Sequence, residues 1–493
     1  MTNTTKATAD HHGALDINEA FRSGGRSPEF LDQINKACIV MLAEAGIVPH
    51  ATAARIASGI ATVIEQMRAE AQKSGVPRRS ADYLDYEPRL TAVVGADASR
   101  LHSGRSRQDI ASAIARMNLR DGLLKEIEAL VIAREKTLAL AARHTETIIP
   151  AYTHGVQAQP TTFAHYLHAL AAALARETQR LQQAYQRINR NPLGAAALAT
   201  SSFPIDRKRL EVLLGFEGLL ENAYDANHLA PVDSALDVAS ALAIAAVQIG
   251  QFAQDMHTQY ADPQPWFLLA EGGLTGVSSI MPQKRNPAAL EQLRAQSSIL
   301  LGEMQTVFLI SHNNRTGMFD YRMYDPVPCA RALQVLKILQ QIMDGLVVNK
   351  ERALAEVKAD YSTTTEIADA LMLKADVPFR IGHHFASKLT DYGRGNQLKL
   401  HDIPYAEAVR IYREQTQQAL PLSEAAFREV ISAEYMVFGR RGIGGPQLDE
   451  VNRMLAEERA NVDADASWLK NSMTRLARAD ATLEQAFTAL ADK

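Results

Sequence analysis

The feature that most constrains the fold is a long apolar segment that begins at Pro231 and ends before Pro263. Its small and apolar side chains recur at alternating spacings of four and three, which is the pattern of one face of an α-helix. They are Ala235, Ala239, Leu242, Ala246, Ile249, Ala253 and Met256, with Val238, Ala245 and Phe252 forming a second stripe. The pattern predicts a helix of about thirty residues that is buried on more than one side.

Four further segments are rich in alanine, leucine and glutamate and lack the alternating pattern of strands. They run from about Asp109 to Ala142, Thr161 to Arg187, Pro287 to Ile310 and Val327 to Leu346. Several long helices with small residues on their faces predict a bundle, so the expected fold class is all-α. The apolar coverage exceeds what the bundle of one chain needs. We therefore expect subunits to associate through these helices, with a large monomeric core as the alternative.

A chain of 493 residues is long enough for about three domains. We expect an N-terminal helical domain over residues 1–109, which starts with a loose polar tail, and a central bundle over residues 110–360, which also carries the oligomer contacts. Residues 361–493 are expected to form a C-terminal helical domain.

Charge and cysteine content argue against several classes of function. A net charge of −4 offers no general attraction to nucleic acid. Cys38 and Cys329 are far apart and have no histidine or cysteine at metal-ligand spacing, so neither a disulfide framework nor a zinc site is predicted. We find no secretion signal and no uninterrupted apolar run of membrane-spanning length. A cytoplasmic protein without nucleic-acid or membrane partners is expected.

Residues 271–287, called the signature loop below, read EGGLTGVSSIMPQKRNP and lead into a predicted helix. We expect Asn286 to cap that helix and Pro287 to be its first residue. The positive end of the helix, with Lys284 and the amide of Asn286 beside it, can hold a carboxylate and stabilise negative charge that develops on it. Without further information, a simple cap and linker is the more common interpretation of such a loop.

The run SSIMPQKRNP resembles the signature loop of the fumarase and aspartase superfamily, and PQK followed by a basic residue resembles argininosuccinate lyases. Two more segments match in the family's order, SGRSRQD at Ser103 to Asp109 and YTHGVQAQP at Tyr152 to Pro160. FPIDR at Phe203 and DVPFR at Asp376 extend the resemblance over nearly the whole chain. The resemblance implies a three-domain fumarase/aspartase-type fold with a central bundle of long helices. It also implies a carbon-nitrogen lyase that releases fumarate without a metal or cofactor.

The resemblance implies a role for each residue of the reaction. In the family, the first serine of the loop removes a proton from the carbon next to a carboxylate; this serine corresponds to Ser278, with Ser279 as the alternative. A serine is a poor base, so its oxyanion needs stabilisation from loop closure, nearby amides and Lys284. His154 is the candidate for protonating the departing nitrogen or polarising it, and Glu291 on the following helix would orient its ring.

Further residues are expected to bind the substrate. Ser106, Arg107 and Gln108 belong to the first matching segment, where the guanidinium of Arg107 would grip a carboxylate. A surface ion pair is the alternative for Arg107. The remaining expected contacts are Thr153, Ser279, Met281, Asn286, Asn35, Asn313, Met318 and Tyr321.

The chain departs from argininosuccinate lyases around the leaving amine. Gln108 stands where those enzymes usually have an asparagine, and Asn35 where they have a serine. In NNRTGMFDYR, the family's tyrosine, glutamine and lysine are replaced by Asn313, Met318 and Tyr321. The apolar Met318 changes which groups can be paired there. We therefore expect an aminopolycarboxylate substrate such as ethylenediamine-disuccinate or iminodisuccinate. Argininosuccinate is the runner-up, and adenylosuccinate is less favoured because no set of basic residues for a phosphate is evident.

The resemblance also implies a homotetramer in which three subunits build each site, because the three matching segments lie where a single bundle would keep them apart. Two other classes were considered. One is a catalytically silent structural protein like the lens crystallins related to this family, against which the retention of Ser278, His154, Lys284 and Asn286 argues. The other is a helical binding scaffold, which would leave the polar loop unexplained.

Overall fold

The computed structural model describes residues 26–74, 80–318, 320 and 330–492. Most of these residues are helical, and the strands are two or three residues long, which confirms the expected all-α class. The loose tail, Tyr321 and Cys329 lie outside the described residues.

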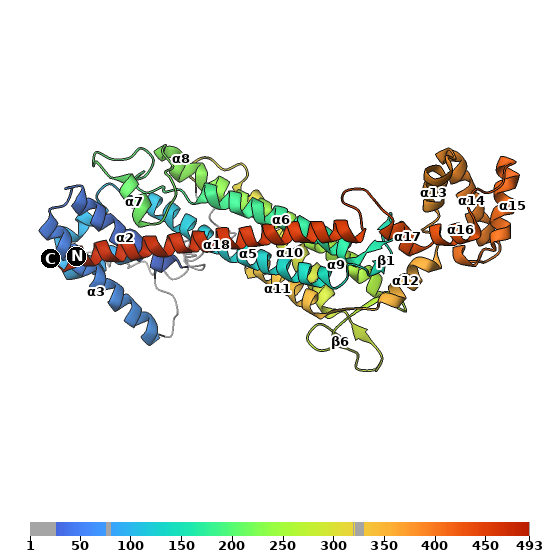
Figure 1. The fold of residues 1–493 in the computed structure, drawn as a ribbon. Helices are drawn as coiled ribbons and strands as arrows, with labels where there is room; N and C mark the ends of the chain where they lie inside the picture. Colours follow the sequence, from blue (N-terminus) through green and yellow to red (C-terminus); the bar gives the residue numbers. More distant parts are fainter. Residues whose placement is uncertain (1–25, 75–79, 319, 321–329, 493) are drawn as a thin grey trace.

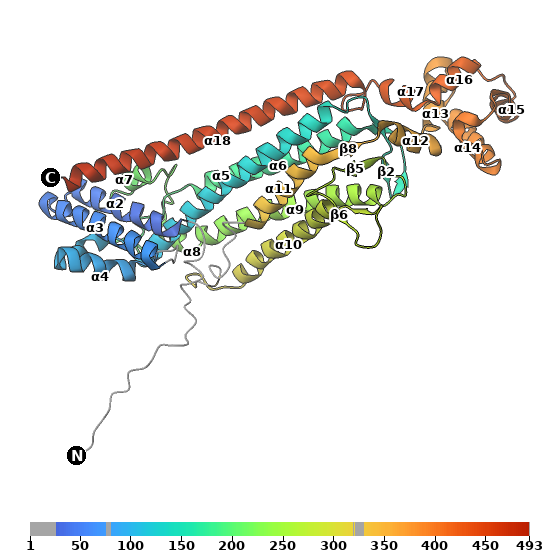
Figure 2. The same ribbon diagram turned by 90° about the horizontal axis from the view of Figure 1, so that it is seen from below.

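The centre of the molecule is a bundle of long helices that run side by side (Figure 1, Figure 2). The helix α9 packs against α10 and α6, and α5 packs against α6 and α11. Their bounds agree with the predicted segments to within three residues at each end: α5 Arg107–Ala142, α6 Phe163–Ile188, α9 Ala230–Tyr260, α10 Ala288–Ser311 and α11 Ala330–Gly345.

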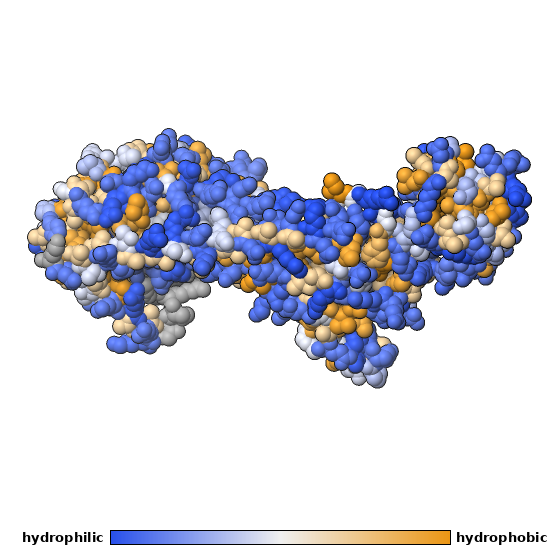
Figure 3. All heavy atoms as spheres, viewed as in Figure 1, coloured by the Kyte–Doolittle hydropathy of each residue, from blue (hydrophilic) through white to orange (hydrophobic). Residues whose placement is uncertain are grey.

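The helix α9 is, by length and composition, apolar enough to cross a membrane, although polar residues interrupt its apolar run. In the fold it is a core helix of the bundle, with 15 of its 31 residues buried within the protomer. Ile244 and Val247 of α9, and Ile299 and Leu309 of α10, nevertheless remain exposed. Figure 3 shows such apolar side chains among the polar surface of the central region. Association through these helices stays a prediction.

One end of the bundle carries the N-terminal helices around a separate core. The N-terminal elements are α2 Ser27–Glu44, α3 His50–Ser74, α4 Tyr83–Val94 and the 3-10 helix η1 Ala96–His102, and α7 Arg207–Leu213 adds residues to their core. The short helix α8 Ala223–His228 contacts α5 and α9. Leu483, Phe487 and Leu490, from the far end of the sequence, belong to the same core.

The other end carries a small lobe with its own core (Figure 1). The elements of this core are α13 Thr365–Ala375, α14 Phe379–Gly395, η3 Leu400–Asp402, α15 Tyr405–Thr416 and α16 Glu424–Val430. The helices α12 Lys350–Ala359 and α17 Ala433–Phe438 pack with Ile148 of the bundle end in a smaller apolar cluster. The last helix, α18 Leu448–Ala491, leaves this lobe and runs back along α5 and α6 to α2 and α3. The predicted domain 361–493 groups α18 with the lobe, whereas its contacts lie with the bundle and the N-terminal helices.

The short strands gather where the bundle meets the small lobe (Figure 2). They form four antiparallel pairs: β1 Ile148–Ile149 with β4 Thr161–Thr162, β2 Tyr152–Thr153 with β3 Val156–Gln157, β5 Phe267–Leu269 with β8 Leu346–Val348, and β6 Gly276–Val277 with β7 Arg285–Asn286. Two of these pairs are hairpins that carry predicted site residues.

Candidate active site

The signature loop is a β-hairpin. Val277 pairs with Arg285 and Gly276 pairs with Asn286, so residues 278–284 form the connection between β6 and β7. The predicted cap is therefore wrong. The backbone of Asn286 belongs to the strand ladder, Pro287 occupies the cap position without a side-chain hydrogen bond, and α10 begins at Ala288.

Ser278 is the first residue of this connection, and its hydroxyl oxygen accepts backbone hydrogen bonds from within the loop. The N–H of Met281 donates to Oγ at 3.1 Å, and the N–H of Ile280 donates at 3.4 Å. Amide donors directed at an oxygen stabilise the negative charge that develops on it. The turn thus supplies part of the stabilisation that a serine base needs. Ser279, Met281 and Lys284 are exposed on the same connection.

Arg285 makes contacts within the signature loop that hold the hairpin together. Its guanidinium pairs with Glu271 at 2.9 Å and donates to the carbonyl of Pro282 at 2.8 Å. From outside the hairpin, the phenol of Tyr260 donates to the carbonyl of Arg285 at 3.2 Å. These contacts attach the signature loop to the last turn of α9.

The second hairpin places His154 at its tip. Thr153 pairs with Val156, and the two residues between them, His154 and Gly155, have positive φ angles of 54° and 75°. Positive φ at both central positions is typical of the type I′ turn that joins such short strands. His154 and Thr153 are both exposed.

Two side chains anchor this hairpin. The amide of Gln157 donates to the hydroxyl of Ser362 at 3.0 Å and to the carbonyl of Val357 at 3.3 Å. The phenol of Tyr152 donates to Gln259 at 3.3 Å. Gln259 is the neighbour of Tyr260, so the last turn of α9 contacts both hairpins.

The expected partnership of His154 and Glu291 is not formed within one protomer. Glu291 lies exposed in the first turn of α10. Neither side chain makes a hydrogen bond or ion pair with the other in the part of the chain that the structure describes. The partnership stays a prediction.

The residues of the first matching segment lie at the start of α5. Ser106 caps the helix, because its hydroxyl accepts the N–H of Gln108 at 3.1 Å while the carboxylate of Asp109 accepts the N–H of Ser106 at 2.8 Å. Burial raises the pKa of Asp109 to about 6. The amide of Gln108 donates to the carbonyl of Asn227 in α8 at 3.0 Å. Arg107 forms an ion pair with Asp82 at 2.8 Å, the contact type named as its alternative role.

The remaining expected contacts lie near the same end of the bundle. Asn35 is fully buried in α2, and its amide has no hydrogen-bond partner among the described residues. Asn313 follows the end of α10 in a left-handed conformation. Met318 is 50% exposed. The hydroxyl of Thr316 lies 3.1 Å from the phenol oxygen of Tyr224 in α8. The helix α8 therefore contacts both this segment and the side chain of Gln108.

The expected site residues therefore fall into two groups at opposite ends of the bundle (Figure 2). Ser106, Arg107 and Gln108 begin α5, which spans 36 residues or about 54 Å, and His154 follows its far end. Likewise, the signature loop precedes α10 while Asn313 follows it. A single chain does not bring the two groups together.

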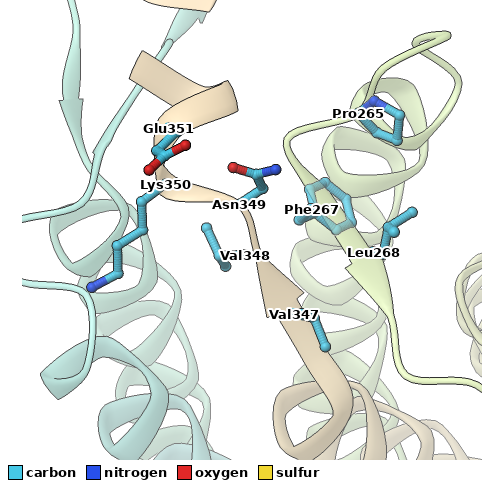
Figure 4. A pocket seen from close by; sticks show the side chains of 8 residues that line it. All are labelled: Pro265, Phe267, Leu268, Val347, Val348, Asn349, Lys350 and Glu351. Atoms are coloured by element: carbon cyan, nitrogen blue, oxygen red, sulfur yellow. The ribbon is translucent and has the colours of Figure 1, made fainter. Parts of the chain in front are cut away.

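A surface cavity of about 530 Å³ lies beside β5 and β8 (Figure 4). Leu268 and Val347 face each other across the two strands and are exposed there. The lining consists of Pro265, Phe267, Leu268, Val347, Val348, Asn349, Lys350 and Glu351. None of the predicted site residues contributes to it.

Comparison with known proteins identifies the family. A family model described as lyase matches residues 17–302, and one described as argininosuccinate lyase C-terminal matches residues 361–437. An argininosuccinate lyase of Agrobacterium fabrum is 31% identical over 472 residues, which are 93% of this chain and 91% of the relative. The argininosuccinate lyase of Methanosarcina acetivorans is 30% identical over 440 residues, which are 87% of this chain and 86% of that relative. The chain belongs to the argininosuccinate lyase family.

Solved structures agree with this assignment. An EDDS lyase in complex with formate superposes with a TM-score of 0.85 at 28% identity, covering 97% of this chain and 96% of that one. An EDDS lyase variant with bound fumarate gives the same TM-score at 29% identity, with the same coverage. A fumarate lyase from Mesorhizobium, at 18% identity and a TM-score of 0.68, covers 89% of this chain and 97% of that one and shares the fold. This family member is a carbon-nitrogen lyase that forms fumarate, and it processes a small dicarboxylate.

Sequence reasoning did not identify Asp82, Gln259 or Tyr260. Tyr260 lies 25 positions before the carbonyl that it binds, and Asp82 lies 25 positions before Arg107. No spacing rule relates residues so far apart.

Proposed function

We propose that this lyase reversibly eliminates an amine from an N-substituted aspartate and gives fumarate, with an aminopolycarboxylate such as ethylenediamine-disuccinate or iminodisuccinate as substrate. The observation that carries this proposal is the likeness to EDDS lyases over 97% of the chain at a TM-score of 0.85. The apolar, half-exposed Met318 supports it, because a methionine offers no strong donor or acceptor for a guanidino group.

The reaction begins at Ser278. Its hydroxyl oxygen, in the oxyanion state stabilised by the amides of Ile280 and Met281, accepts the proton from the carbon next to a carboxylate. The resulting carbanion places a second negative charge on that carboxylate. Lys284 and the amide of Asn286 are the groups on the hairpin that stabilise this charge.

Elimination completes the sequence. The electron pair of the carbanion forms the carbon-carbon double bond of fumarate as the carbon-nitrogen bond breaks. The departing nitrogen takes a proton from His154, whose ring Glu291 of another subunit would orient. Arg107 holds a carboxylate throughout by its fork of donors.

We propose a homotetramer in which each site takes segments from three subunits. The two groups of site residues at opposite ends of α5 support this arrangement, since antiparallel neighbours would bring them together. Val277 and Ile280, on either side of Ser278, are 79% and 82% exposed, which is unusual for large apolar side chains next to a reacting group. Light scattering measures the mass directly, and an active monomer contradicts the proposal.

Argininosuccinate is the second candidate substrate, favoured by the curated relatives at 30–31% identity. The test is run in the synthetic direction. The enzyme is incubated with fumarate and, separately, with ethylenediamine, aspartate and arginine, while the loss of fumarate absorbance is followed. Reaction with the diamine or with aspartate is expected. Reaction with arginine alone selects the second candidate, and no reaction with any amine favours a catalytically silent structural protein.

A further inference from the structure

The ion pair between Arg107 and Asp82 joins the start of α5 to the start of α4. Nη2 of Arg107 lies 2.8 Å from Oδ2 of Asp82. The two side chains differ in burial, because 47% of the arginine side chain is exposed but only 12% of the aspartate. The anion is thus the fixed end of the pair, and the cation is the end that a ligand can reach.

Asp82 is held in place by contacts of its own. Its Oδ1 accepts the N–H of Leu84 at 3.0 Å and so caps α4, and its own N–H donates to the hydroxyl of Ser80 at 3.2 Å. The helix contact thus uses Oδ1, and the contact with Arg107 uses Oδ2. A carboxylate that caps a helix cannot rotate to follow a mobile guanidinium without losing the cap.

The adjacent residue fixes the same junction from the protein interior. Tyr83 is buried, and the guanidinium of Arg105 lies over its ring at 4.6 Å from the centroid. Arg105 is itself buried and stands two positions before Arg107. The dipeptide of Asp82 and Tyr83 therefore contacts both arginines that flank Ser106, which sets the position of α4 relative to the carboxylate-binding segment.

We propose that Asp82 is a positioning residue, which orients the guanidinium of Arg107 so that its remaining N–H donors meet a carboxylate of the dicarboxylate substrate. This inference rests on the proposed function, in which Arg107 binds that carboxylate. A free arginine loses side-chain entropy when it binds a ligand. Asp82 removes part of this cost in advance by restricting the guanidinium before the substrate arrives.

The test uses Asp82→Asn in the full-length protein. Asparagine caps a helix as well as aspartate does, so α4 is retained while the charge that orients Arg107 is lost. Asp85→Asn is the matched control, because Asp85 lies in the first turn of the same helix and accepts a hydrogen bond from the hydroxyl of Ser80, which an asparagine oxygen can also accept. Thermal unfolding of each variant verifies that the fold is intact.

Binding of succinate, a non-reacting dicarboxylate, is measured by calorimetry. We expect Asp82→Asn to raise the Kd about tenfold, a loss of ~1.4 kcal/mol, and Asp85→Asn to leave it unchanged. Arg107→Ala should weaken binding at least as much, and adding Asp82→Asn to it should have no further effect, because the two residues act through one contact. In turnover, Asp82→Asn should raise KM and keep kcat within about twofold.

Two results would overturn the inference. One is succinate binding that is unchanged or tighter in Asp82→Asn, which would make Asp82 a bystander or a competitor of the substrate. The other is unchanged binding in Arg107→Ala. Failure of the proposed function can be told apart from failure of this inference, because succinate has no leaving amine and its binding does not depend on turnover. Absence of turnover with every amine contradicts the proposed function, whereas the binding results still test the role of Asp82.

Discussion

The phenol of Tyr260 donates a hydrogen bond to the main-chain carbonyl of Arg285 at 3.2 Å. Arg285 lies in β7, opposite Val277, so this contact fixes the strand pair from which Ser278 extends. The other residues of the connection, from Ser279 to Lys284, are exposed. The bundle therefore restrains the two strands of the hairpin. The connection between the strands is not restrained in this way and can close over a substrate.

Replacement of Tyr260 by phenylalanine should reduce kcat severalfold and leave the melting temperature nearly unchanged. The variant loses one hydrogen bond, worth about 1 kcal/mol, at the hairpin that carries Ser278, the proposed base. Tyr405→Phe is the matched control, because the phenol of Tyr405 also donates to a carbonyl, that of Leu422, in the distant small lobe. Equal effects of the two variants on kcat would contradict a role of Tyr260 in placing the loop. Steady-state kinetics of the two variants and the parent protein measures these changes in kcat.

Ser278→Ala should abolish turnover, with a fall in kcat of at least about a hundredfold, the low end of the range for a general base. The side chain makes no contact that the core requires, so circular dichroism should remain that of the parent protein. Ser279→Ala should show a smaller loss. If Ser279→Ala instead causes the larger loss, Ser279 is the base, and the match between this loop and the family's motif shifts by one residue.

Mixing two inactive variants should restore activity if subunits share sites. In tetramers assembled from equal amounts of Arg107→Ala and Ser278→Ala, about a quarter of the sites receive both native segments from different chains. Fumarate formation should therefore recover to roughly that fraction of the unmodified rate. Each variant carried through the same refolding alone is the control. Absence of recovery in tetramers with two distinguishable tags would contradict shared sites.

Glu126 should make the protein less stable as the pH rises. It is buried in α5, and neither carboxyl oxygen has a hydrogen-bond partner among the described residues. Burial raises its pKa from 4.5 to about 8. The folded state thus holds a proton that the unfolded chain releases. The stabilising effect of this bound proton is complete below pH 4.5 and is lost progressively up to pH 8.

Glu126→Gln should abolish this dependence, since the amide carries no charge at any pH. Near pH 4.5 the variant and the parent should unfold at similar temperatures. At pH 8 the variant should be more stable, by the order of 2 to 4 kcal/mol. Glu128→Gln, two residues along the same helix and exposed, is the control. A parallel pH dependence in variant and parent would show that Glu126 is charged in the folded protein.

The long helices could be predicted from the sequence because their signal is local. The stripe that runs from Ala235 to Met256 repeats with the helical period, and prolines mark its ends, so the predicted and observed bounds of α9 differ by at most three residues. The capping box of Ser106 and Asp109 is likewise contained in four consecutive positions. Such features need no knowledge of what packs against them.

The hairpins could not be predicted in the same way. Asn286 looks like a helix cap in sequence, but it pairs with Gly276 ten positions earlier. Strands of two residues are too short to show alternation, so the pairing leaves no pattern to detect. The path of α18 and the contact of Asp82 with Arg107 also depend on tertiary packing alone. The motifs indicated candidate residues for the reaction, whereas the contacts that hold these residues leave no pattern in the sequence.

The path of α18 has a consequence for biosynthesis. The core around α2 and α3 is completed by Leu483, Phe487 and Leu490, which the ribosome makes some 400 residues after those helices. Until then the N-terminal helices lack the part of this core that the end of α18 supplies. Domains commonly fold in order as they emerge. Here the core of α2 and α3 includes residues from the last helix, so this core is complete only when translation ends.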